Sequence, residues 1–66
     1  MAYYYVNVRA QPNGDHEVHE QGCRFMPLIR RDLGEHPNCQ SAIKGAKKIY
    51  PESNGCFYCS YPCHTG

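Results

Sequence analysis

Residues 55–64 read Gly-Cys-Phe-Tyr-Cys-Ser-Tyr-Pro-Cys-His, and this stretch decides how the rest of the chain is interpreted. It holds three of the five cysteines of a sequence of 66 residues. A domain of this length buries only roughly 60% of the surface that its unfolded chain exposes, so its apolar core is marginal. Small domains often need disulfides, a metal ion or a partner chain for stability. We therefore expect the cysteine-rich stretch to stabilise the fold.

Five cysteines are far more than a chain of this length ordinarily contains. In a secreted protein they would indicate a disulfide framework. Residues 1–5 show none of the basic, apolar or cleavage-site features of a secretory signal, and no apolar run reaches transmembrane length. We therefore expect a cytoplasmic protein without membrane contact, formed by a single domain over residues 1–66. Its cysteines are expected to be reduced and to bind a metal ion rather than to form disulfides.

The spacing of the C-terminal cysteines favours zinc. Two residues separate Cys56 from Cys59, which lets both sulfurs reach one ion from a tight turn. Cys63 follows four residues later, and Tyr61-Pro62 can turn the chain back toward the same point. These three cysteines are predicted zinc ligands, one fewer than the four of a tetrahedral structural site.

The fourth zinc ligand must come from another segment or from the adjacent histidine. Cys23 is the first choice, because it follows Gly22 at the end of a predicted hairpin, where a strand end can meet the C-terminal segment. His64 comes second and His19 third. His16 is three residues from His19, so the two point to opposite faces of a regular strand. Cys39 is interpreted as a small buried apolar residue of a helix.

Two other chemistries use related cysteine patterns. A thiol-redox protein places Cys-x-x-Cys at a helix N-terminus after a strand, where the thiol pKa falls. Here Cys56-x-x-Cys59 follows the predicted helix, which disfavours redox catalysis but leaves it as an alternative. Haem attachment uses Cys-x-x-Cys-His, and the segment from Cys59 to His64 has one residue too many.

Histidines and carboxylates gather at residues 15–20, in the sequence Asp-His-Glu-Val-His-Glu. Such groups can serve in acid–base catalysis, but a turn and a half-exposed strand also carry polar side chains. A catalytic site usually needs a pocket, which a domain of this size can hardly enclose. We therefore predict no catalytic residues, and the leading hypothesis is a non-enzymatic domain.

The N-terminal half is predicted to form a β-hairpin. Residues 3–8 are aromatic and β-branched, as suits a strand. Residues 11–15, Gln-Pro-Asn-Gly-Asp, contain strong turn formers, and residues 16–20 form the returning strand. Alternation along the first strand divides its side chains between two faces. The predicted core face carries Tyr4, Val6 and Val8.

One helix is predicted in the second half. Asn38 is a favoured N-cap residue, and Pro51 stops the helix. Lysines lie on its far side and in its last turn, where they complement the helix dipole. Apolar residues recur at helical spacing at Cys39, Ala42, Ile43, Ala46, Ile49 and Tyr50.

The remaining segments carry weaker signals. Residues 33–36 are predicted to form a short third strand, and residues 56–59 a last one. The apolar side chains of Phe25, Leu28 and Ile29 are expected beneath the sheet. The predicted class is α+β: a small antiparallel sheet of about three strands, one helix packed on one face, and a cysteine-rich C-terminal segment.

A partner surface is predicted on the other face of the sheet. Tyr3 and Tyr5 would present aromatic rings there, with Arg9 nearby. Rings beside arginines resemble a stacking platform for single-stranded nucleic acid. The formal net charge of +1 lacks the positive excess typical of such proteins. A metal-free domain that binds nucleic acid or protein through this face is the second hypothesis, after a zinc-stabilised interaction module.

Several segments together carry a likeness to known sequences: residues 3–7, 13–19, Cys23, 46–51, Gly55–Cys59 and Cys63-His64. In these segments the chain resembles a group of short, uncharacterised bacterial proteins. The likeness spans nearly the whole sequence and implies a stand-alone bacterial domain, without implying an activity. The order strand, strand, strand, helix is also similar to the small repeat of the YegP-like domains, which lacks the cysteines.

Overall fold

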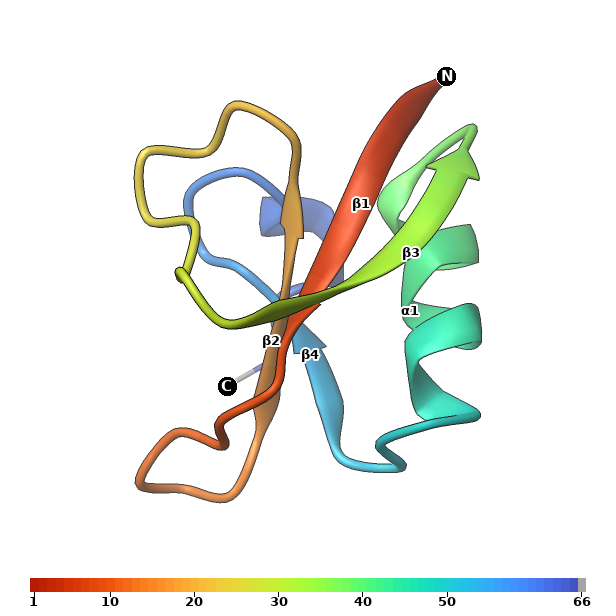
Figure 1. Ribbon diagram of the computed structural model, residues 1–66. Helices are drawn as coiled ribbons and strands as arrows, with labels where there is room; N and C mark the ends of the chain where they lie inside the picture. Colours follow the sequence, from red (N-terminus) through yellow and green to blue (C-terminus); the bar gives the residue numbers. More distant parts are fainter. Residues whose placement is uncertain (66) are drawn as a thin grey trace.

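The computed structural model describes residues 1–65 and shows an α+β fold in which one helix packs against a four-stranded sheet (Figure 1). This confirms the predicted class. Along the described chain, no helix has the length and apolar character needed to cross a membrane. The elements are β1 (Ala2–Asn7), β2 (His16–Glu20), β3 (Arg30–His36), α1 (Cys39–Lys47), β4 (Ser53–Gly55) and a 3₁₀ helix, η1 (Tyr61–Cys63).

The sheet is mixed, not purely antiparallel as predicted. Its strand order is β3-β1-β2-β4, and β1 pairs antiparallel with both β2 and β3. The short β4 runs parallel to β2, so that Ser53 lies opposite His16 and Gly55 opposite Val18. Parallel strands need a long crossover connection. Here α1 provides it, because it carries the chain from β3 across the sheet to the free edge of β2.

The predicted hairpin is confirmed. The turn that joins β1 to β2 is closed by a hydrogen bond from Gly14 N to Gln11 O (2.8 Å), and Gly14 has a positive φ of 93°. Tyr4 and Val6 are buried, as the alternation predicts. Val8 is 38% exposed, contrary to the prediction, because β1 ends at Asn7 and no longer holds Val8 over the core.

The helix α1 begins where the sequence indicates. The Asn38 side chain caps it by accepting a hydrogen bond from Ser41 N at 2.9 Å. Ala42 and Ala46 are fully buried, and their small side chains let the helix lie close to the sheet. The core that results is small. Its buried members are Tyr4, Val6, Val18, Cys39, Ala42 and Ala46.

The loop between β2 and β3 does not fold beneath the sheet. Phe25, Leu28 and Ile29 are 48%, 94% and 54% exposed, so the expectation that they would be buried is wrong. The chain leaves the sheet through a turn at residues 20–23, which directs the following residues outward. Residues 56–59 are likewise not a strand, since the chain bends away as soon as β4 ends at Gly55.

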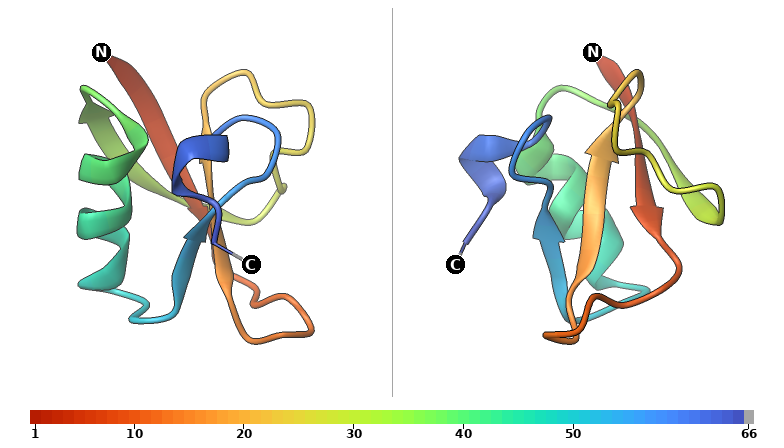
Figure 2. Two further views of the ribbon diagram at one scale, coloured as in Figure 1. Left: turned by 180° about the vertical axis from the view of Figure 1, so that it is seen from behind. Right: turned by 90° about the vertical axis from the view of Figure 1, so that its left-hand side faces the viewer.

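The C-terminal segment folds back over β4, so that η1 lies beside both β4 and α1 (Figure 2). It approaches Gly55 so closely that a Cβ placed there would lie 2.6 Å from Ser60 O. The buried Asn54 anchors its end, because Thr65 N donates to Asn54 Oδ1 (2.9 Å) and Asn54 Nδ2 donates to Thr65 O (2.9 Å).

A disulfide joins Cys39 at the start of α1 to Cys63 in η1, with their Cα atoms 6.2 Å apart. This corrects the expectation that all cysteines are reduced and that Cys39 is merely a small apolar residue. The cause is the return of the chain over Gly55, which brings η1 against the first turn of the helix. The three other cysteines have free thiols.

Candidate metal centre

Two turns from distant parts of the sequence supply the candidate ligands. The first lies at the end of β2, where His19 belongs to the strand and Cys23 follows a turn at residues 20–23. Cys23 N donates to Glu20 O at 3.1 Å, and Gly22 has a positive φ of 91° that suits a glycine. This turn folds the thiol of Cys23 back toward the imidazole of His19.

The second turn follows β4. Cys56 N donates to Val18 O at 2.9 Å, which continues the pairing with β2 by one residue. Ser60 N then donates to Cys56 O at 2.9 Å, so residues 56–60 form a compact turn. Glu20 N donates to Cys59 Sγ at 3.3 Å. Both thiols of this turn therefore face the end of β2.

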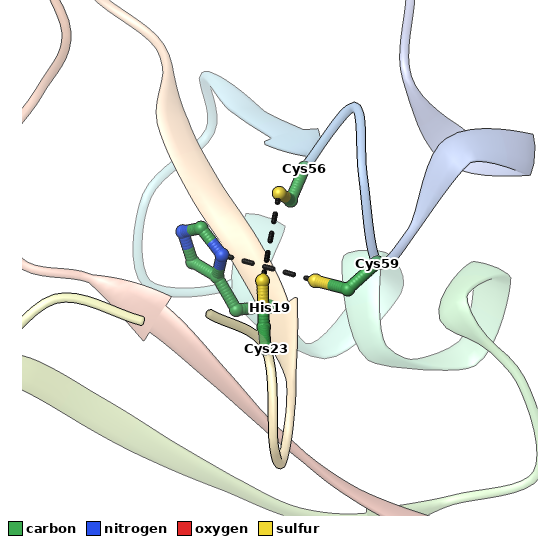
Figure 3. Close-up of side chains that lie close together, drawn as sticks. All are labelled: His19, Cys23, Cys56 and Cys59. Carbon is green, nitrogen blue, oxygen red and sulfur yellow. Dashed lines mark hydrogen bonds between the residues drawn. The ribbon is translucent and has the colours of Figure 1, made fainter. Parts of the chain in front are cut away.

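The four side chains converge on one point (Figure 3). Their ligand atoms all lie within 4.8 Å of one another. The Sγ atoms of Cys23 and Cys56 are 3.9 Å apart, and Cys59 Sγ is 3.8 Å from His19 Nδ1. Tetrahedral zinc with ordinary bond lengths separates two sulfurs by about 3.8 Å and a sulfur from a nitrogen by about 3.6 Å. These two pairs thus already have the spacing of a zinc site.

The imidazole of His19 is oriented by a carboxylate. Its side chain is only 1% exposed, and Nε2 lies 3.3 Å from Glu17 Oε1. A carboxylate beside Nε2 favours a proton on that nitrogen and leaves the lone pair on Nδ1, which faces the sulfurs. Burial lowers the pKa of His19, although the charge of Glu17 acts in the opposite direction. A neutral imidazole with a free Nδ1 is the form that binds metals.

The Cys59 thiol is unlike a redox nucleophile. Burial, together with hydrogen bonding to Cys23, raises its pKa to about 12, and the hydrogen bond from Glu20 N offsets only part of this rise. Catalytic thiols instead have pKa values below the free value of about 8.5. The two cysteines also do not lie at the N-terminus of an α-helix, since residues 56–59 form the turn between β4 and η1. These features count against the thiol-redox alternative.

The structure brings together three predicted ligands, Cys23, Cys56 and Cys59, and places the fourth elsewhere. Cys63 does not reach the cluster, because its sulfur is bonded to that of Cys39. His64 also turns away, with Nδ1 3.1 Å from Gly55 O.

His19, the last of the reserve ligands, completes the group. As the alternation predicts, its neighbour Val18 faces the helix-side core while His19 faces the cysteines. His16 lies away from this group, stacked on Tyr50 with ring centroids 4.0 Å apart. The alternation of side chains in residues 16–20 is the signal that could have identified His19 as a ligand. With Val18 assigned to the core, His19 must lie on the opposite face of the strand.

The predicted tyrosine face is only partly open. Tyr3 is 44% exposed, while Tyr5 is half-buried and lies under the Arg30 guanidinium, 5.2 Å from its ring centroid. Arg9 is exposed beyond the end of β1.

No protein-family model, curated protein or solved structure matches this chain. The likeness to short bacterial proteins therefore stays a prediction.

Proposed function

We propose that this protein is a small zinc-binding domain, in which the ion stabilises the fold and the folded domain serves as an interaction module. The observation that carries the proposal is the convergence of one imidazole nitrogen and three free thiols within 4.8 Å of one another. They come from two turns more than 30 residues apart in sequence, since Cys23 and Cys56 are separated by 33 residues.

The donor set favours zinc and a structural role. Thiolates and imidazole are the ligands of tetrahedral zinc, and Cys₃His is one of the usual structural combinations. Carboxylate-rich sites suit magnesium or calcium instead. Four protein ligands fill the coordination sphere and leave no position for a substrate, whereas catalytic zinc sites keep one position open.

Because the apolar core is small, a bound ion would contribute substantially to the stability of the fold. Six residues form the buried apolar cluster, and two of them are alanines. The metal would join the end of β2 to the turn after β4 and so fix the edge of the sheet. Because the site forms only in the folded chain, the free energy of metal binding adds directly to the free energy of folding.

Cobalt substitution tests the proposal. Titration of the reduced, metal-free protein with Co²⁺ is expected to give visible d–d bands of tetrahedral cobalt and near-ultraviolet thiolate-to-cobalt charge transfer, both reversed by Zn²⁺. Cys23→Ser should weaken or abolish these bands. The matched control is the Cys39→Ser/Cys63→Ser double variant, which removes two cysteines outside the cluster and should keep the spectrum. A wild-type protein without tetrahedral bands would contradict the proposal. So would a Cys23→Ser variant that keeps the bands while the Cys39→Ser/Cys63→Ser control loses them.

A further inference from the structure

Four exposed aromatic residues form a continuous surface beside the candidate metal centre. We call Phe25, Phe57, Tyr58 and Tyr61 the aromatic platform. Phe25 stacks on Tyr58 with ring centroids 4.4 Å apart, and Phe57 contacts Tyr58 and Tyr61 edge to face, each at 5.2 Å. Their exposed fractions range from 48% for Phe25 to 67% for Tyr58. Large rings so open to solvent in so small a protein suggest a binding surface.

The platform is built on the two turns that hold the ligands. Phe57 and Tyr58 are the two residues between Cys56 and Cys59, and Phe25 follows Cys23 by two positions. The loop after β2 and the turn after β4 lie side by side at one end of the molecule (Figures 1 and 2). An ion that joins these turns would also hold Phe25 against Tyr58, so metal binding would fix the shape of the platform.

The charged residues of the two segments that carry the platform are arginines. Residues 21–31 and 54–65, which carry it, contain Arg24, Arg30 and Arg31 but no aspartate or glutamate. The Arg24 guanidinium lies 5.7 Å from the centroid of the Phe25 ring. A zinc ion with three thiolates and a neutral imidazole would add a formal charge of about −1 beneath the surface. The exposed Arg24 guanidinium lies beside the platform rings, whereas Arg30 lies over Tyr5 of β1. Arg24 is therefore the cation that the platform offers to an anionic partner.

We propose that the aromatic platform binds single-stranded nucleic acid, with bases stacked on the tyrosine and phenylalanine rings and a phosphate paired with Arg24. Proteins that bind single strands usually stack the bases on aromatic rings and contact the phosphates with cationic side chains. This inference names a partner for the interaction module and so rests on the proposed function. Exposed rings with a guanidinium beside them offer both a stacking surface for bases and a partner for phosphate, and single-stranded nucleic acid uses the two together.

Fluorescence anisotropy with a labelled oligothymidylate of about 10 nucleotides tests this inference on the zinc-loaded protein. Tyr58→Ala and Tyr61→Ala should each lower the affinity by about 5- to 100-fold, since one stacked base is lost. Tyr58→Phe should bind like the wild type, because the ring is kept. Arg24→Ala should reduce the slope of log affinity against log salt concentration by about 0.7, as expected for the loss of one phosphate contact.

Zinc content, measured on every variant, separates the two proposals. A zinc-loaded wild type that does not bind the oligonucleotide would overturn this inference and leave the zinc site intact, whereas a wild type without zinc would overturn the proposed function itself. Leu28→Ser is the matched control, because it removes an exposed side chain of the same loop outside the platform. If Tyr58→Ala and Tyr61→Ala bind as well as the wild type, or if Leu28→Ser loses as much affinity as they do, the inference is wrong and a protein partner becomes the better explanation.

Discussion

At the scale of single residues, the histidine of the centre depends on its neighbour two positions earlier in β2. Glu17 and His19 point to the same face of the strand, and the carboxylate lies 3.3 Å from Nε2 of the imidazole. The opposite nitrogen, Nδ1, lies 3.8 Å from Cys59 Sγ. A carboxylate behind a ligating histidine fixes the tautomer and ring orientation and raises the basicity of the ligand. Glu17 is therefore a positioning residue of the site.

Replacing Glu17 by glutamine should weaken zinc binding by about 10- to 100-fold, because the amide keeps the size of the side chain but not the charge behind His19. Competition with a chromophoric zinc chelator measures the change. Glu35→Gln removes an exposed carboxylate of β3, which β1 separates from β2, and serves as the control. Equal zinc affinities of the two variants would show that Glu17 does not position the ligand.

The sequence allowed part of the ligand set to be predicted. Cys56 and Cys59 follow from their spacing, and Cys23 follows from its place at the end of a hairpin. The choice between Cys63 and His19 depends on which sulfur meets Cys39, and that contact joins residues 24 positions apart. Spacing along the chain carries no information about such a contact, so it predicts Cys63 as a ligand and leaves His19 as a reserve for the fourth position.

At the scale of elements, the return of the chain over β4 depends on a residue without a side chain. A Cβ at Gly55 would lie 2.6 Å from Ser60 O and 2.9 Å from the carbonyl carbon of Cys63. Both neighbours are backbone atoms, which cannot move aside without displacing the turn after β4. Glycine here is required by close approach and not by a positive φ.

Gly55→Ala should therefore destabilise the zinc-loaded protein by about 1–3 kcal/mol, as overpacking of buried sites usually does. Urea unfolding followed by circular dichroism measures the loss. The paired control is Gly45→Ala in α1, where a Cβ would meet only the His36 ring, at 3.7 Å. This second change should stabilise the helix by up to about 1 kcal/mol. Similar stabilities of the two variants would contradict the account of the C-terminal segment.

Local signals explain which elements could be predicted. The hairpin follows from the Asn13-Gly14 turn and strand alternation, and α1 follows from Asn38 and its apolar periodicity. The strand β4 has only three residues, and its parallel pairing with β2 depends on where α1 returns the chain. The exposed loop after β2 was predicted as buried, because apolar composition alone does not show that Phe25 packs on Tyr58 at the surface.

At the scale of the whole molecule, two cross-links would compensate for a small core. The candidate metal centre joins the end of β2 to the turn after β4, and the disulfide joins α1 to η1. They act at different places, so removal of one should leave the other in place. Residues 56–63 take part in both, through Cys56 and Cys59 in the candidate metal centre and Cys63 in the disulfide.

Replacing both disulfide partners, as in Cys39→Ala/Cys63→Ala, should destabilise the protein by up to about 3–4 kcal/mol, the chain-entropy value for a loop of this length. The truncation of the buried Cys39 adds a smaller loss. Zinc affinity should stay close to that of the wild type, since neither sulfur belongs to the cluster. Urea unfolding and chelator competition on the same samples measure the two quantities. A large loss of zinc affinity would show that Cys63 is a ligand after all.

Native mass spectrometry under reducing conditions tests the central claim most directly. We expect one zinc ion per chain, and this ion should remain bound when the disulfide is reduced. A strong chelator should remove it, and Cys23→Ser and His19→Ala should each carry much less zinc than the wild type. The metal-free chain should also lose the dispersed NMR spectrum of the folded domain. A wild-type chain that carries no zinc, or one that keeps full zinc occupancy when both Cys23 and His19 are replaced, would contradict the account.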